Sequence, residues 1–214
     1  MDERIERGMR AQLEGWRSAL ARPGVERVGW KVGLNAPPVM EALGLDRPVI
    51  GWIASGTTLE PRAELTTAGT TKLCAEPELA ITVGADNAVA GLGPAIELVD
   101  IDKPFEDLAA ILADDIFHRG VVFGPVSDPR PLEGITARIE RDGAPEAELD
   151  LADTVGDPAD VVELVAGRLA EVGVELRPGD RIIAGSLTPI LWAEPGAEAM
   201  LDLGPLGAVS VRYR

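Results

Sequence analysis

Three glutamates could together form a metal site: Glu76 and Glu78 in the segment AEPELAITVG, and Glu97 in GPAIELVD. Side chains of a strand alternate between its two faces, so Glu76 and Glu78 share a face if the segment is extended. Neighbouring carboxylates repel each other unless a cation lies between them, and Mg²⁺ or Mn²⁺ prefers oxygen ligands. A solvated strand face is the alternative. Glu97 favours the metal site, because it lies in a second apolar run, where a carboxylate needs a partner.

The composition restricts the classes of partner. The formal net charge of the 214-residue chain is −16, and no block of Lys or Arg could follow phosphates, so nucleic acid and anionic membranes are not expected partners. No run reaches the roughly 18 apolar residues of a membrane-spanning helix, and the N-terminal MDERIERGMR is too charged for a signal peptide. A single cysteine, Cys74, excludes an internal disulfide, which fits a cytoplasmic protein. We expect Cys74 to be a small core residue.

The apolar periodicity predicts many short strands and a few helices. Abundant Gly and Pro between them favours an α+β fold over alternating βαβ units. The predicted helices cover residues 5–20, 37–45, 104–119 and 158–172, the last opened by Asp157-Pro158 and ended by Gly173. The predicted strands lie in residues 28–34, 48–54, 75–84, 94–100, 121–126, 181–196 and 208–214, with a turn-rich stretch at 85–93 and a hairpin around Asp142-Gly143.

Six segments resemble a known family. GWKVGL, PVIGW, EPELAITVG, PAIELVD, GDRIIAGSLTPILWAEPG and LGPLGAVSVRY are similar to the 2-keto-4-pentenoate hydratases of the fumarylacetoacetate hydrolase superfamily, which include the 4-oxalocrotonate decarboxylases. The resemblance runs from the first helix to the C-terminus and is most specific around GSLTP. It implies a mixed β-roll core in residues 71–214, with a small N-terminal α/β part in residues 1–70 packed on it as a single structural unit. It also implies a small 2-oxo or 2-hydroxydienoic acid substrate from the breakdown of aromatic compounds.

The resemblance assigns roles to particular residues. The metal-binding acids of the family fall on Glu76, Glu78 and Glu97, which implies bound Mg²⁺ or Mn²⁺. The family's strand lysine falls on Lys31, beside the substrate, where it supplies a positive charge, or a proton if burial lowers its pKa. A salt bridge to a nearby acid is the alternative role for Lys31. The family's substrate-binding loop falls on Gly185, Ser186, Leu187 and Thr188, with Ser186 as a further catalytic candidate.

His118 is the only histidine of the chain, and it follows a segment that departs from the family. Where members read ADNAS, this chain has residues 113–117, so His118 is a third catalytic candidate, although a lone histidine is more often structural. Ser55 and Gly56 occupy the place of an acidic pair, residues 85–93 replace a longer insert, and residues 151–156 replace a Gly-rich turn. These departures leave the metal shell intact and change groups that handle protons in the family.

The expected reaction is the addition of water to a 2-hydroxy-2,4-dienoate, giving a 4-hydroxy-2-oxo acid. Decarboxylation, C–C hydrolysis or a catalytically altered homologue are the alternatives. A homo-oligomer is expected from the family and from Trp52, Trp192 and a C-terminal strand ending in Tyr213, which suggest apolar surface. A complex with a related decarboxylase or hydratase subunit is a further expectation from the family.

Overall fold

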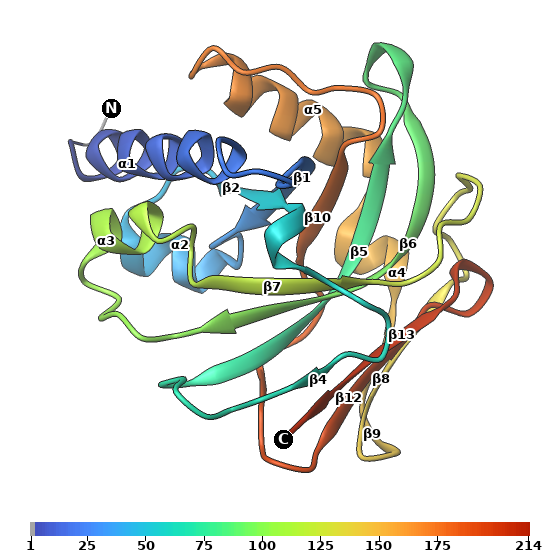
Figure 1. Ribbon diagram of the computed structural model, residues 1–214. Helices are drawn as coiled ribbons and strands as arrows, with labels where there is room; N and C mark the ends of the chain where they lie inside the picture. Colours follow the sequence, from blue (N-terminus) through green and yellow to red (C-terminus); the bar gives the residue numbers. More distant parts are fainter. Residues whose placement is uncertain (1–2) are drawn as a thin grey trace.

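The computed structural model describes residues 3–214, which form two β-sheets with helices packed against them (Figure 1). The larger sheet contains β1 (Arg27–Gly33), β2 (Val49–Ala54), β3 (Thr58–Leu59), β5 (Leu73–Val83), β6 (Val89–Asp100), β7 (His118–Phe123), β10 (Arg181–Ser186) and β11 (Leu191–Trp192). The smaller sheet contains β4 (Glu64–Leu65), β8 (Thr136–Arg141), β9 (Ala144–Asp150), β12 (Glu198–Asp202) and β13 (Ala208–Tyr213). The helices are α1 (Glu3–Leu20), α2 (Pro37–Leu43), α3 (Leu108–Ala113), α4 (Leu151–Val155) and α5 (Pro158–Ala170).

The larger sheet is mixed and curls into a half-barrel. Its strand order is β2-β1-β10-β5-β6-β7-β3, with β11 paired to β5 beyond the end of β10. The β1–β10 and β3–β7 pairs are parallel, and the other pairs of this sheet are antiparallel. The smaller sheet has the order β4-β13-β12-β8-β9 and lies across one end of the half-barrel (Figure 1). This architecture, a mixed and strand-rich core with few helices, agrees with the predicted mixed β core, while the α+β class stays a prediction.

The predicted boundary at residue 70 stays a prediction, but the structure ties the two parts together closely. Strands β1 and β2 come from the N-terminal part and extend the sheet that β10, β5 and β6 build. Helix α1 packs along α3, which comes from the later part (Figure 1). Gly8 permits this approach, because a Cβ there would lie 2.7 Å from the Cβ of Leu112.

Alternation along β5 and β6 separates the core from the acidic face. Leu79, Ile81 and Ile96 are fully buried in the main hydrophobic cluster, which also takes in residues of the smaller sheet and α5. Glu76, Glu78 and Glu97 occupy alternate positions of the same strands, so their side chains point to the opposite face. The period of two therefore places all three glutamates on one face, as predicted, between the small apolar clusters that contain Cys74 with Val99 and Ala80 with Ala95.

Several predicted elements are confirmed by the described residues. Helix α5 begins at Pro158 behind Asp157, whose side chain accepts a hydrogen bond from the Ala159 amide. The hairpin of β8 and β9 turns at Asp142 and Gly143, whose φ angles are 53° and 74°. Cys74 is fully buried, as expected of a core residue.

Other boundaries were predicted wrongly. The helix expected over residues 104–119 is limited to α3, because Asp115, Ile116 and Phe117 have left-handed φ angles of 55°, 55° and 63°, and β7 already begins at His118. In the turn-rich stretch only residues 84–88 turn, and β6 begins at Val89. A short helix for which no prediction was made, α4, covers residues 151–155 and uses Asp150 as its N-cap.

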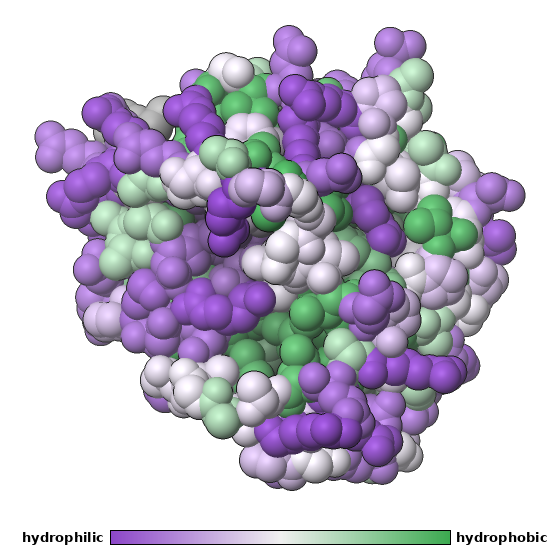
Figure 2. Space-filling model, viewed as in Figure 1, coloured by the Kyte–Doolittle hydropathy of each residue, from purple (hydrophilic) through white to green (hydrophobic). Residues whose placement is uncertain are grey.

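Of the three aromatic residues expected to provide apolar surface for an oligomer, only Trp192 is exposed. Trp192 is 46% exposed, whereas Tyr213 is 2% exposed and belongs to the core, so Tyr213 does not provide the apolar surface expected of it. Trp52 is partly buried against the same core. Figure 2 shows one face that is mainly hydrophilic, with hydrophobic residues gathered in a hollow in its lower half. Among the described residues, no helix has the length and apolar character needed to cross a membrane.

Gly29 provides a test of the β1–β10 pairing that carries Lys31. A Cβ on Gly29 would lie 1.8 Å from the Arg181 carbonyl oxygen of β10. We predict that Gly29→Ala lowers the free energy of unfolding by roughly 2 kcal/mol or more, because β1 and β10 would have to move apart to make room for the added methyl group. Gly167→Ala is the control: nothing lies within 4 Å of its Cβ position in α5, so alanine should hold or raise stability. Urea unfolding measures both, and equal stabilities for the two variants would contradict the pairing.

Candidate metal centre and substrate cavity

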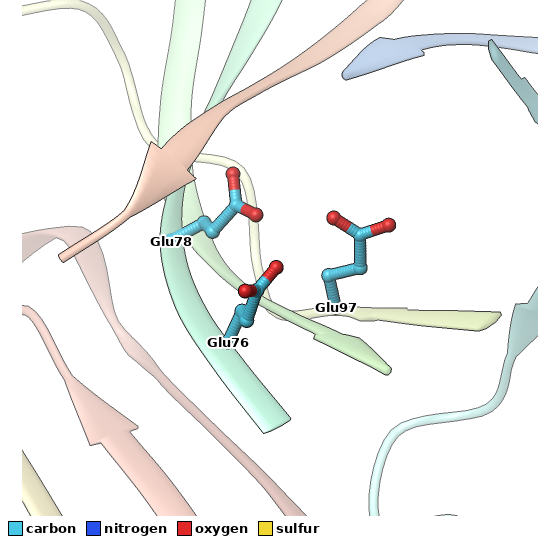
Figure 3. A group of neighbouring side chains, drawn as sticks. All are labelled: Glu76, Glu78 and Glu97. Carbon is cyan, nitrogen blue, oxygen red and sulfur yellow. The ribbon is translucent and has the colours of Figure 1, made fainter. Parts of the chain in front are cut away.

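The three glutamates meet on one face of the β5–β6 pair. The register places Glu76 directly opposite Glu97, and Glu78 lies two residues along β5. One carboxylate oxygen from each lies within 4.8 Å of the other two, and Figure 3 shows the three side chains converging. The structure thus brings together the residues that the strand spacing singles out, and their role as metal ligands stays a prediction.

Lys31 enters the site from β1 and is buried. Its Nζ forms an ion pair with Glu97 Oε1 and donates a 3.1 Å hydrogen bond to the Ile116 carbonyl oxygen. Gly51 on the neighbouring strand makes room for it, because a Cβ there would lie 2.6 Å from Lys31 Cγ. Burial alone would lower the pKa of Lys31, but the attraction of Glu97, Asp115 and Glu76 outweighs burial and raises it. Lys31 therefore stays a cation, and a proton supply through a lowered pKa is not supported.

A β-bulge directs His118 toward Glu97. Along β6 and β7 the register pairs Leu98 with Gly120 but Val99 with His118, so one residue of β7 is skipped and His118 shares the face of Glu97. His118 Nδ1 lies 2.7 Å from Glu97 Oε1, and His118 Nε2 lies 3.0 Å from Thr57 Oγ1. Burial lowers the pKa of His118 despite Glu97, so the ring is neutral at neutral pH and donates from Nδ1 to the carboxylate.

A second bulge arranges the GSLTP segment around Glu78. The register of β10 on β5 shifts between Ile183 and Ser186, so that Ser186 comes to lie opposite Glu78. Gly185 has φ 100°, a conformation that favours glycine, and its amide donates a 2.6 Å hydrogen bond to Glu78 Oε2. Since this amide already serves Glu78, it is not free to bind a substrate carboxylate, which the sequence had suggested for it.

The charges of the triad are only partly compensated. Burial would raise the pKa of Glu97, but Lys31 and His118 outweigh burial and lower it. Burial and the charge of Glu97 raise the pKa of Glu76 to about 7, and burial with both neighbouring acids raises the pKa of Glu78 well above its usual value. Glu78 Oε1 is buried and has no hydrogen-bond partner among the described residues. Two destabilised carboxylates and a free oxygen are the surroundings that a hard divalent cation requires.

Asp115 forms a second buried acid behind Lys31. Its Oδ1 accepts hydrogen bonds from the Trp52 amide at 2.9 Å and from Gln12 Nε2 at 3.3 Å. Burial raises the pKa of Asp115 well above its usual value. Asp115 begins the left-handed segment that continues through Ile116 and Phe117, so the carbonyl bonded to Lys31 comes from strained backbone.

A cavity of about 480 Å³ opens beside the triad. Of the predicted site residues, Lys31, Glu76, Glu97, Ser186 and Thr188 line it. Glu78, Gly185, Leu187 and His118 are not among its lining residues: Glu78 and His118 lie behind the wall, and Leu187 is 7% exposed in the main core. The Ser186 hydroxyl donates to the Thr188 carbonyl oxygen at 2.8 Å, which shapes this part of the wall.

The sequence interpretation missed several residues of the site. Asn35 lines the cavity, and its side-chain amide lies against Gly185, where a Cβ would be 2.3 Å from Asn35 Nδ2. Thr57 supports His118, and Asp115 lies behind Lys31. The GWKVGLN order places Asn35 four residues after Lys31, so a local sequence signal exists for Asn35. Thr57 and Asp115 reach the site through long-range packing, which leaves no local signal.

The chain is similar to known proteins over most of its length. A curated 2-hydroxyhexa-2,4-dienoate hydratase of Comamonas testosteroni is 25% identical to it, across 89% of this chain and 79% of the relative. The solved 4-oxalocrotonate decarboxylase of Pseudomonas putida G7, complexed with magnesium and adipate, superposes with a TM-score of 0.87 at 22% identity, covering 97% of this chain and 85% of that chain. The fumarylpyruvate hydrolase of Pseudomonas aeruginosa, solved with Mn²⁺ and pyruvate, gives a TM-score of 0.67 at 20% identity, covering 88% and 89%. No family model matches the chain.

These similarities support the family that the sequence motifs suggest. The solved structures show that this chain has their fold, and they contain divalent metals. The chain itself has an acidic group, Glu76, Glu78 and Glu97, that could bind such a metal. The general kind of activity among the relatives is that of hydratases and decarboxylases.

The raised pKa of Glu76 predicts a pH effect in the metal-free protein. A carboxyl group with a pKa of about 7 when folded, against an ordinary 4.5, stabilises the fold fully below the lower value, and this contribution is lost as the pH rises toward 7. Glu76→Gln should therefore gain stability over the original protein between about pH 5 and about pH 8, by at most roughly 3 kcal/mol, since Glu76 borders the cavity and solvent screens it.

Urea unfolding in the presence of a chelator, at both pH values, measures this gain. Glu163→Gln, on the exposed side of α5, is the matched control and should show no such change. A stability difference between Glu76→Gln and the original protein that does not vary with pH would refute the electrostatic coupling of the triad.

Proposed function

We propose that this chain is a Mg²⁺- or Mn²⁺-dependent enzyme that adds water to a 2-hydroxy-2,4-dienoate, giving a 4-hydroxy-2-oxo acid. The observation that carries the proposal is the arrangement of Glu76, Glu97 and Lys31 on the wall of one cavity, with Glu78 directly behind. The similarity to a curated dienoate hydratase supports the reaction type. A bound divalent metal supplies Lewis-acid polarisation of the carboxylate and 2-oxygen of the substrate.

The carboxylates are suited to hold the metal and to keep its position. Glu97 is fixed by Lys31 and His118, and Glu78 is fixed by the Gly185 amide, so neither side chain has to be ordered when the metal binds. His118 has no place on the cavity wall, so we assign it a positioning role that acts through Glu97. Glu76 borders the cavity, so a metal held by these carboxylates would be accessible to a substrate in the cavity.

Lys31 provides the charge that the reaction needs at the substrate. Deprotonation of the 2-hydroxyl and protonation at the far end of the dienol pass through a species with negative charge on the 2-oxygen. Lys31 Nζ is a buried cation on the cavity wall, and a charge in such a site stabilises developing negative charge more than it would in water. Asn35, Ser186 and Thr188 provide further polar side chains of the wall, and we assign the substrate carboxylate to them. The hydroxyls of Ser186 and Thr188 donate to the carbonyl oxygens of Thr188 and Pro189, so each has to rotate before it can donate to the substrate.

The assembly of the protein stays a prediction. Trp192 provides exposed apolar surface, and the hydrophobic hollow of Figure 2 is the kind of surface that a subunit contact covers. We keep the proposal of a homo-oligomer, or of a complex with a related decarboxylase or hydratase subunit. A cytoplasmic location, expected from the single cysteine, is likewise kept as a proposal.

An ultraviolet assay of 2-hydroxypenta-2,4-dienoate tests the proposed reaction. We expect Mn²⁺-dependent loss of the dienoate absorbance with a 4-hydroxy-2-oxo acid as product, and no loss in the presence of a chelator. Release of carbon dioxide, or no consumption with Mn²⁺ or Mg²⁺ present, would contradict hydration.

Lys31→Met separates catalysis from metal binding in the same assay. Turnover should fall by roughly two orders of magnitude or more, because the cation beside the 2-oxygen is removed. Thermal stabilisation by Mn²⁺ should persist, since a lysine is not a ligand for a hard cation. Lys72→Met removes an exposed lysine and is the control, with unchanged turnover expected. Full activity of Lys31→Met would exclude the assigned role.

A further inference from the structure

The polarity of the cavity wall changes along the strands that form it. Glu76 and Glu97 form one register pair, and the next position of β6 on the same face is Val99, two residues or about 7 Å further along. Trp192 of β11 pairs with Cys74, which is also two residues from Glu76. The wall is therefore acidic and polar around the triad and becomes apolar one pleat further along the strands.

Apolar side chains dominate the wall beyond the triad. We call this part the distal wall; it consists of Val99, Ile101, Phe105, Phe117, Ile190 and Trp192. Phe105 is 42% exposed and Trp192 is 46% exposed, which places both at the mouth of the cavity. Among residues 3–214, Lys31 is the one cation that lines the cavity, and it is already engaged by Glu97 and the Ile116 carbonyl oxygen.

We infer that the site selects 2-oxo and 2-hydroxydienoic acids that have a single carboxylate and an apolar tail, and that it rejects dicarboxylates. The inference rests on the proposed function. With the carboxylate and 2-oxygen held beside the triad and Lys31, an extended chain of six carbons reaches the distal wall. A methyl or longer alkyl end loses contact with water there, which is favourable. A second carboxylate would lie against apolar side chains there, and the described lining residues offer it no cation besides Lys31, in a chain that already carries an excess of acids.

A pair of six-carbon ligands tests this selection without turnover. 2-Oxohexanoate and 2-oxoadipate share the 2-oxo acid group and differ at the last carbon, which is a methyl group in one and a carboxylate in the other. In calorimetric titrations at saturating Mn²⁺, we expect 2-oxohexanoate to bind at least about tenfold more tightly than 2-oxoadipate. A chelator should abolish the binding of both.

Two variants place a cation on the distal wall. Phe105→Arg and Trp192→Arg each alter a side chain that is partly exposed, and each should reverse the preference toward 2-oxoadipate. Val126→Arg is the matched control: Val126 is 55% exposed and apolar but is not a lining residue of the cavity, so the original preference should remain.

The outcomes separate the inference from the proposed function. Equal or tighter binding of 2-oxoadipate by the unaltered protein would overturn the selection for an apolar tail and leave the metal-dependent 2-oxo acid site in place. If both arginine variants keep the original preference for 2-oxohexanoate, the distal wall is excluded as the cause of that preference. If 2-oxohexanoate, 2-oxoadipate and pyruvate all fail to bind with Mn²⁺ present, the proposed function and the inference are both wrong.

Discussion

Repulsion among three closely spaced carboxylates, two of them buried and one half-buried, is the constraint on which the rest of this site depends. Glu76, Glu78 and Glu97 offer oxygens within 4.8 Å of one another, and Glu97 alone is paired with charged or hydrogen-bonding side chains. The fold holds them there because their backbones belong to adjacent strands of a well-packed sheet, whose other face forms the main core. Stability gained in that core offsets the free-energy cost of holding the three carboxylates so close together.

Departures from regular strand geometry complete the arrangement. One bulge turns His118 toward Glu97, and another sets Gly185 against Glu78 and Ser186 toward the cavity. The left-handed residues from Asp115 to Phe117 direct a carbonyl to Lys31, and each such non-glycine residue costs of order 1 kcal/mol. Bulges and strained backbone concentrate near functional sites, because they direct groups that a regular ladder would direct elsewhere.

The sequence predicts the parts of this site that depend on local periodicity. Glu76 and Glu78 share a face because strands have a period of two, and the motif around Lys31 identifies a buried charged residue. The two bulges, the pairing of His118 with Glu97 and the position of Asp115 depend on contacts between distant segments, so no local pattern reports them. The helix predicted over residues 104–119 failed for the same reason: its apolar period is adequate, but tertiary contacts of Ile116 and Lys31 favour the left-handed turn that ends α3. The apolar distal wall combines residues from segments far apart in the sequence, from Val99 to Trp192, so no local pattern reports it either.

Anomalous diffraction from a crystal of the protein soaked in Mn²⁺ tests the central claim most directly. The account predicts an anomalous peak bounded by the carboxylates of Glu76, Glu78 and Glu97, at metal–oxygen distances of about 2.1 Å, with its open side toward the cavity that Lys31 lines. A peak at another group of acids, or the absence of any peak at the triad at saturating Mn²⁺, would contradict it.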